Sequence, residues 1–202
     1  MSDTKIRGPD KRRELRAVSD GFSVRDDGGA KYLEGHFAVF NSDYEIWDGM
    51  TESIAPGAFA SSLAGNIRAL INHDTTLVLG RTKAGTLELR EDSRGLWGRV
   101  TLNTEDTDAM NLYARVKRGD VGGCSIGFNV LKEEHSVRGD GGDHWNILSV
   151  DLHEVSVCTF PAYTETNIAA RCADREAVRE EKRRAAEQWK ETQIRRLKRD
   201  GS

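Results

Sequence analysis

Two long segments rich in β-branched residues, separated by a short loop, constrain the fold of this chain more than any other feature. They are SIGFNVLKEEHSV, which begins at Ser125, and HWNILSVDLHEVSVCTF, which begins at His144. The loop between them, RGDGGD, is rich in Gly and Asp, which adopt the backbone conformations that tight turns need. The pattern predicts two antiparallel strands and a fold that is mainly β.

Other parts of the chain show the same character. The segment KYLEGHFAVF, from Lys31 to Phe40, alternates its side chains between two faces, as a strand does. The segments TLELRED and GLWGRVTL flank the turn Asp92-Ser93-Arg94 and predict a second hairpin. We therefore expect a β-rich body.

Helices are expected only at the periphery, so the predicted fold class is mainly β with peripheral helices (α+β). The best helix is TEDTDAMNLYARVKRG, where Thr104 can cap the start and Gly119 ends it. It has an apolar stripe made of Ala109, Leu112, Tyr113 and Val116. A shorter helical turn is expected from Phe59 to Ala64, after Pro56.

Changes in composition divide the chain into three parts. Residues 1–13 are polar and are expected to be a flexible segment, and residues 14–170 form the β-rich domain. Residues 171–202 form a tail in which DREAVREEKRRAAEQWKETQIRRLKRD, beginning at Asp174, lacks Gly and Pro and is highly charged. We expect a solvated helix there, because its few apolar residues make only a narrow stripe.

Composition excludes several classes of protein. No apolar run approaches the roughly 20 residues that a membrane span needs, and the first residues lack the apolar region of a secretory signal. Cys124, Cys158 and Cys172 are odd in number and widely spaced, which argues against a disulfide framework and against a structural zinc site. The segment HEVSV carries Val157 where a second zinc-binding histidine would stand. The sequence also lacks a phosphate-binding loop and a basic-aromatic surface of the kind that binds RNA.

The segment Gly123-Cys124-Ser125-Ile126-Gly127 fits G-x-S-x-G, the pattern of the nucleophile elbow in α/β-hydrolases. That elbow requires a strand, a sharp turn and a helix within a parallel sheet. Here a predicted strand follows the serine, and the chain lacks alternating strands and helices. An α/β-hydrolase-type esterase is thus a weak alternative, and Ser125 can still be a nucleophile of another kind.

A serine nucleophile needs a base to take its proton and a third group to orient that base. Among the five histidines, His36 sits within an alternating strand, and His135 and His144 flank the Gly/Asp loop and are expected to be exposed. His73 is the better candidate, because it follows the apolar run that ends at Ile71, where a buried strand ends. A surface histidine at a strand end remains the simpler interpretation.

The third group is sought in LHEVSVCTFPA. Glu154 is a carboxylate in an apolar strand, where it needs a partner, and a histidine N–H would satisfy it. The alternative is a Glu on the solvent-facing side of the strand. His153 is adjacent, but strand alternation places it on the opposite face, so only one of the two can face His73.

Seven segments, taken in order, resemble the prohead protease family of tailed bacteriophages, the serine proteases that mature viral capsids. They are GHFAVFN, ESIAPGAF, IRALINHD, LGRT, GLWGRV, VGGCSIGF and LHEVSVCTFPA. The resemblance runs from about Arg13 to Ala170. It implies that His73 is the base, Ser125 the nucleophile and Glu154 the third catalytic residue.

The resemblance also carries expectations about fold and site. It implies an antiparallel β-barrel of the type found in herpesvirus assembly proteases, and it implies neither a metal nor a cofactor. Because those enzymes use a second histidine, His153 stays an alternative third member. The turn Phe160-Pro161-Ala162 is a candidate source of oxyanion donors.

Expected substrates are the major capsid protein, a scaffold protein and the protease itself, and a homodimer is compatible with the resemblance. Neither a membrane nor a specific nucleic acid is expected as a partner. The expected location is the assembling prohead in the cytoplasm of the bacterial host. The alternative from another class is a non-enzymatic scaffold or assembly factor on the same fold, with a degenerate site.

Overall fold

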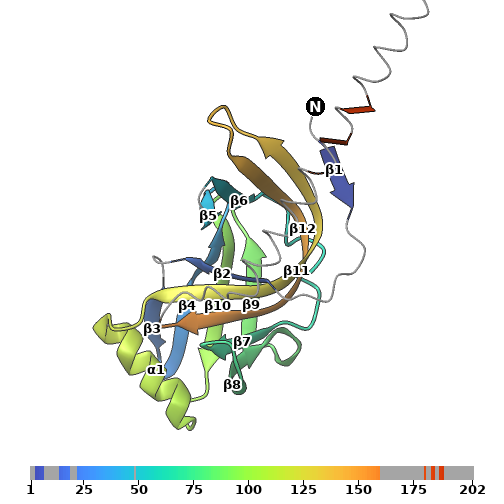
Figure 1. The fold of residues 1–202 in the computed structure, drawn as a ribbon. Coiled ribbons are helices and arrows are strands. Elements are labelled where there is room, and N and C mark those ends of the chain that lie inside the picture. The colour runs from blue at the N-terminus through green and yellow to red at the C-terminus, as the bar shows by residue number, and fades with distance from the viewer. Residues whose placement is uncertain are drawn as a thin grey trace, which may run out of the picture. The chain divides into compact units, whose positions relative to one another are not determined.

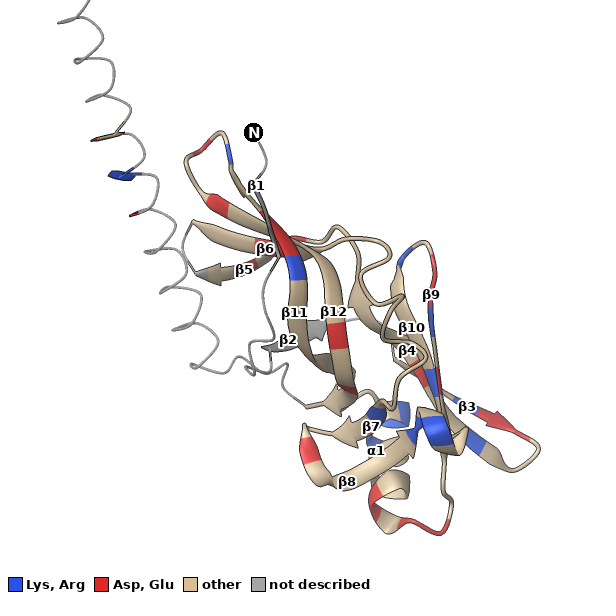
Figure 2. Ribbon diagram, turned by 90° about the vertical axis from the view of Figure 1, so that its right-hand side faces the viewer, with Lys and Arg blue, Asp and Glu red and all other residues tan. Residues whose placement is uncertain are grey.

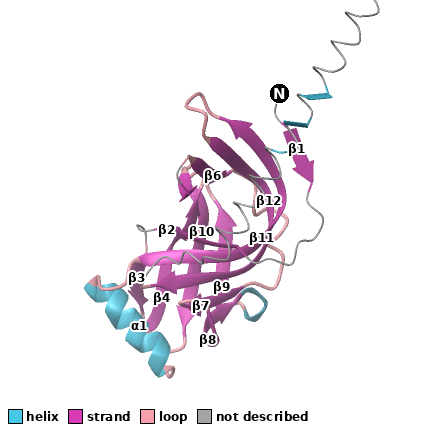
Figure 3. Cartoon of the chain, in the orientation of Figure 1, coloured by secondary structure: helices cyan, strands magenta, loops and turns pink. Residues whose placement is uncertain are grey.

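The computed structural model describes residues 3–6, 14–18, 22–47 and 49–159, and five helical residues between 180 and 188. The chain divides into two compact units, Met1–Tyr163 and Thr164–Ser202. The first unit is mainly β, with a single α-helix in its described part (Figure 1, Figure 3). The mainly β class predicted from the sequence is therefore confirmed.

The first of two sheets contains eight strands and is built around the predicted long hairpin, β11 (Gly123–Val137) and β12 (Asp143–Cys158). These two strands pair antiparallel along their whole length. The outer edge of β11 pairs with β1 and β2, and the outer edge of β12 pairs in parallel with β6 and β7. The remaining strands of the sheet are β1 (Asp3–Ile6), β2 (Glu14–Val18), β5 (Tyr44–Trp47), β6 (Met50–Ile54), β7 (Arg68–Ile71) and β8 (Asp74–Arg81).

The second sheet contains four antiparallel strands in the order β3-β4-β10-β9. The predicted turn at residues 92–94 does join β9 to β10 as a hairpin. The strands are β3 (Ser23–Asp27), β4 (Ala30–Val39), β9 (Leu87–Glu91) and β10 (Gly95–Leu102). The described strands form two sheets and do not close into the barrel that the family resemblance implies, so that finer expectation is not confirmed.

One hydrophobic core is shared by both sheets and the helix. Fully buried side chains come from the second sheet and from alternate positions of the long hairpin, among them Leu33, Phe37, Leu96, Val100, Ile126, Phe128 and Val155. This arrangement uses one face of β11 and β12 for the core and leaves the other face for polar side chains. Acidic and basic residues are interspersed over the strands (Figure 2).

The helix α1 (Thr107–Arg118) lies beside β3, with the predicted stripe of Ala109, Leu112, Tyr113 and Val116 buried (Figure 1). Gly119 ends it in a left-handed conformation, as predicted. Its N-cap is Asp106 rather than Thr104, since the Asp106 carboxylate accepts from two backbone N–H groups of the first turn. The predicted helical turn at residues 59–64 is a run of hydrogen-bonded turns instead. A short 3-10 helix, η1 (Thr82–Ala84), follows β8.

The structure describes only parts of the two terminal segments that the sequence predicts. Residues 3–6 belong to the segment expected to be flexible, yet they form β1. The charged tail lies almost wholly outside the described residues. Within it, Glu180 pairs with Arg183 and Arg184 at helical spacing. The domain boundaries themselves stay predictions.

In the part of the chain that the structure describes, no helix combines the length and apolar character needed to cross a membrane.

Candidate active site

His73 occupies the tip of a tight hairpin between β7 and β8. Ile71 and Asp74 are paired across the two strands, so Asn72 and His73 alone make the turn. Both have positive φ angles, 49° and 62°, as the two central residues of a type I′ turn require. Because the left-handed region costs a non-glycine residue roughly 1–2 kcal/mol, the histidine holds a position that glycine would occupy more easily. Strain of this kind is often found at functional sites.

The hairpin tip is anchored to the end of β12. Asn72 donates its backbone N–H to the Val157 carbonyl at 3.0 Å, and its side-chain oxygen accepts from the Thr159 N–H at 2.9 Å. The parallel pairing of β7 with β12 continues up to this point. His73 is therefore held against β12 although the two lie far apart in sequence.

A β-bulge in β12 determines which side chains face His73. Leu152 and Val155 both belong to the core although they are three positions apart, and the register with β11 shifts between them. An extra residue in one strand reverses the alternation of the side chains beyond it. His153 and Glu154 therefore both lie on the sheet face opposite the core. The expectation that they point to opposite faces is wrong, because it assumed a regular strand.

Of these two neighbours, Glu154 is the one that contacts His73. Its Oε1 lies 2.6 Å from His73 Nδ1, and the carboxylate is buried. His153 has an ion-pair distance of 3.9 Å to Asp151 and is partly exposed. A buried carboxylate is costly unless it is paired, and the imidazole N–H supplies that pairing with a charge-assisted hydrogen bond.

Ser125 lies on the same sheet face as Glu154. Its neighbours Cys124 and Ile126 belong to the core, so its own side chain points away from the core. It pairs directly with Ser156 of β12, and the next pair on the same face is Gly127 with Glu154. The structure thus brings Ser125, His73 and Glu154, the three predicted site residues, to one region of one sheet face.

The G-x-S-x-G pattern has a different meaning here from that in an α/β-hydrolase. Ser125 lies inside the continuous strand β11, within an antiparallel pair, and no helix follows it directly. The interpretation as a nucleophile elbow is therefore wrong. In a strand, the spacing instead puts Gly123 and Gly127 beside Ser125 on the same face, where neither has a side chain to cover the hydroxyl.

Three buried side-chain polar atoms have no hydrogen-bond partner in the described part of the chain. They are His73 Nε2, Ser125 Oγ and Asn129 Oδ1. Buried polar atoms are nearly always paired, so each exception needs an explanation. Two of the three are the atoms that a serine hydrolase uses for chemistry, and Asn129 lies farther along the same face of β11. Hydrogen bonds between catalytic groups often form only once a substrate binds.

Ser156 is a second serine at the site, which sequence reasoning did not single out. Its hydroxyl donates to Glu154 Oε2, and its oxygen accepts from the His73 backbone N–H at 3.3 Å. A hydroxyl already committed to a carboxylate is a poor nucleophile candidate, whereas the Ser125 hydroxyl is uncommitted. The signal that could have identified Ser156 in the sequence was its position two residues after Glu154 in the same strand.

Cys158, two residues beyond Ser156, does not offer a competing nucleophile. Burial, with a smaller contribution from the Glu154 carboxylate, raises the pKa of this thiol from 9.0 to about 12. The thiolate is the reactive form of cysteine, and a thiol with so high a pKa forms very little thiolate at neutral pH.

The other histidines have structural partners. His36 Nε2 lies 2.8 Å from Asp92, and His135 Nε2 lies 2.9 Å from Asp143. His135 also packs on the Trp145 ring. His135 and His144 are only 12% and 14% exposed, so the expectation that they are exposed is wrong.

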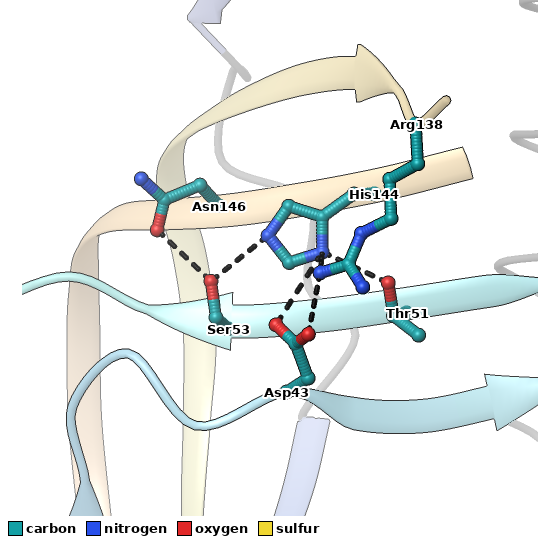
Figure 4. A network of polar contacts seen from close by, with 6 residues as sticks. All are labelled: Asp43, Thr51, Ser53, Arg138, His144 and Asn146. Atoms are coloured by element: carbon teal, nitrogen blue, oxygen red, sulfur yellow. Dashed lines mark hydrogen bonds and ion pairs between the residues drawn. The ribbon is translucent and has the colours of Figure 1, made fainter. Parts of the chain in front are cut away.

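His144 belongs to a polar network at the far end of the hairpin (Figure 4). Its Nδ1 is within hydrogen-bond distance of Arg138 and Thr51. Because an arginine can only donate, Nδ1 is the accepting nitrogen and the proton lies on Nε2. The Nε2–H therefore donates to Ser53 at 3.0 Å. Arg138 in turn donates to Asp43 at 2.6 Å. The network joins β12 to β6 and fastens the loop that carries Arg138.

One further expectation lies outside the described residues. The turn at Phe160-Pro161-Ala162, the candidate source of oxyanion donors, is not described, and neither is Cys172. Among the described residues, no group of three or more His, Cys, Asp or Glu side chains is arranged to hold a metal ion.

The chain is similar to known proteins in sequence and in structure. A family model described as the caudovirus prohead serine protease matches residues 19–181. The prohead protease of Enterobacteria phage HK97 is 36% identical over 148 residues, which are 71% of this chain and 61% of that protein. The match thus spans less than two thirds of the relative's length. Among solved structures, the bacteriophage T4 capsid assembly protease matches with a TM-score of 0.49 at 10% identity, covering 73% of this chain and 97% of the other.

Proposed function

This chain belongs to the caudovirus prohead serine protease family, and on that premise we propose that it is a serine endopeptidase with Ser125, His73 and Glu154 as its catalytic residues. The observation that carries the proposal is the 2.6 Å contact between His73 Nδ1 and Glu154, on the sheet face that also bears Ser125. The uncommitted Ser125 Oγ and His73 Nε2 support it.

The contact with Glu154 determines what the histidine can do. In a neutral imidazole one nitrogen carries the proton and the other accepts one. Because the carboxylate accepts a hydrogen bond from Nδ1–H, the lone pair resides on Nε2. This is the nitrogen that takes the hydroxyl proton from a serine nucleophile in a triad.

The reaction follows serine protease chemistry. Ser125 Oγ attacks the carbonyl carbon of the scissile peptide bond while His73 Nε2 accepts its proton. The tetrahedral intermediate collapses as His73 gives the proton to the leaving amine, and the acyl group stays on Ser125. Water, deprotonated by His73, then releases the acid product and restores the serine. Glu154 stabilises the imidazolium formed at each stage.

Substrates and partners follow from the family. We take the substrates to be the scaffold region of the major capsid protein or a separate scaffold protein, and the protease itself, inside the prohead. A homodimer and an antiparallel barrel of the herpesvirus-protease type are compatible with this proposal. Backbone N–H groups must stabilise the oxyanion, and the turn at residues 160–162 is our candidate for them.

The test is cleavage of the major capsid protein co-expressed with this chain. Wild type should shorten the capsid protein, and intact-mass measurement should locate the cut and any self-cleavage. The matched chain with Ser125→Ala should leave both proteins full length. If the two chains give the same capsid protein mass, a non-enzymatic assembly factor on the same fold becomes the better description.

A further inference from the structure

Ser156 connects the two residues that prepare the nucleophile. Its Oγ–H donates to Glu154 Oε2, while the other oxygen of that carboxylate, Oε1, faces His73 Nδ1. The same Oγ accepts the backbone N–H of His73. Ser156 is fully buried, so water does not compete for these bonds.

Each of the two bonds restrains a different degree of freedom. The hydrogen bond to Oε2 fixes the rotation of the carboxylate about its terminal torsion, which is otherwise broad. With Oε2 held, Oε1 stays directed at the imidazole. The bond from the His73 N–H holds the backbone of a residue that sits at a φ of 62°. Without it, the turn has one restraint fewer against relaxing.

We propose that Ser156 is a positioning residue of this active site: one hydroxyl orients both Glu154 and the backbone of His73, and thereby keeps the imidazole in the tautomer with the proton on Nδ1. The proposal rests on the proposed function of Ser125, His73 and Glu154. Ser156 takes no part in bond making, because its proton is engaged by Glu154 throughout.

The chain contains a matched control for this residue. Ser62 is also buried, and its hydroxyl likewise makes one bond in each direction, donating to the Val150 carbonyl at 2.6 Å and accepting from the Leu152 N–H at 3.0 Å. Both of its partners belong to β12, as Glu154 does, but neither is a site residue. Ser62→Ala therefore also removes one donated and one accepted hydrogen bond, both to backbone atoms and neither to a site residue.

The first measurement is independent of activity. The full chain carrying Ser125→Ala, labelled with ¹⁵N-histidine, reports the tautomer of His73 by NMR, and His73→Gln identifies the signals. We expect a single tautomer with the proton on Nδ1. Adding Ser156→Ala should produce a mixture of tautomers, whereas adding Ser62→Ala should leave the His73 signals unchanged.

The second measurement is kinetic, with Ser125 restored and a peptide that spans the mapped cleavage site as substrate. Ser156→Ala should lower kcat by roughly tenfold to a hundredfold, because small displacements of catalytic groups have effects of that size. The KM should stay within about twofold, since the hydroxyl is not expected to touch substrate. Ser156→Thr, which retains the hydroxyl, should recover most of the rate.

The outcomes separate this proposal from the proposed function. If Ser156→Ala keeps the parent's His73 signals and kcat, or if Ser62→Ala shifts the signals equally, the positioning role is wrong. If Ser156→Ala does not fold, Ser156→Cys is the substitute, because it fills the site with a slightly larger group that is a much weaker donor. It should show the same mixed tautomers, and unchanged signals in it would overturn the proposal. Cleavage by the Ser125→Ala chain would overturn the proposed function, while the NMR result would still decide whether Ser156 orients His73.

Discussion

His73 Nδ1 lies 2.6 Å from Glu154 Oε1 although the two residues are 81 positions apart in the chain. Parallel pairing of β7 with β12 brings the hairpin tip to this point, and the bulge in β12 turns Glu154 toward it. The contact therefore belongs to the folded framework and is present before any substrate arrives.

Ser125→Ala should lower proteolysis by at least about a thousandfold, because the attacking oxygen is removed. The fold should persist, since the hydroxyl has no hydrogen-bond partner to lose in the described part of the chain. Cleavage of capsid protein is followed by gel electrophoresis and the fold by circular dichroism. Ser93→Ala, at an exposed turn, is the control and should cleave like wild type.

Replacements at His73 should separate activity from stability. His73→Ala and His73→Gly should both abolish cleavage, because each removes the base. The glycine variant should be the more stable of the two by about 1 kcal/mol, since only glycine adopts a positive φ without a steric penalty. Urea unfolding of the two variants measures the difference. Equal stability would mean that the turn relaxes once the imidazole is gone.

Glu154→Gln should lower kcat, but by roughly two orders of magnitude less than Ser125→Ala, because an orienting group is less indispensable than nucleophile or base. His153→Ala should change kcat little, since this side chain is partly exposed and, among the described residues, has only a long contact with Asp151. Both rates are measured on the same peptide substrate. The reverse order of severity would show that the enzyme uses two histidines.

The pH dependence of stability should contain a contribution from Cys158. Burial raises the pKa of its thiol from 9.0 to about 12, so the folded chain keeps this proton where the unfolded chain has lost it. The resulting stabilisation is complete below pH 9 and is lost as the pH rises from about 9 to 12. The difference in unfolding free energy between the wild type and Cys158→Ala should therefore shrink between pH 8 and pH 10.5. A constant difference would contradict the raised pKa.

Gly95→Ala should destabilise the fold by about 2 kcal/mol or more, because buried overpacking forces the backbone to shift. A Cβ at Gly95 would lie 2.0 Å from the Ala38 carbonyl oxygen, where β10 meets β4. Gly139→Ala is the control, since a Cβ there meets no atom within 4 Å. Thermal unfolding of the two variants is the measurement. Similar melting temperatures would contradict the close approach of β10 to β4.

Local patterns in the sequence determined much of the fold. The long hairpin, the hairpin around residues 92–94 and the helix ended by Gly119 all followed from alternation, turn residues and capping, which act over a few neighbouring positions. The helix start was misassigned to Thr104, because the Asp106 carboxylate caps the N–H groups of Asp108 and Ala109 and the helix begins later in the chain. Ser125 and His73 were recognisable as candidates from their motifs and from the family resemblance.

Tertiary structure alone decided how those candidates meet. Regular alternation predicted that His153 and Glu154 face opposite sides, whereas an inserted residue in β12 puts both on one face, and only the core positions of Leu152 and Val155 reveal this. His144 likewise acquires Thr51 and Ser53 of β6 as partners, 93 and 91 positions away, whereas His135 pairs with Asp143 across its own hairpin. The role of Ser156 depends on contacts to both Glu154 and His73. Sequence periodicity reports which face of a strand a residue occupies, whereas bulges and long-range strand pairing are set by the packing of the whole chain.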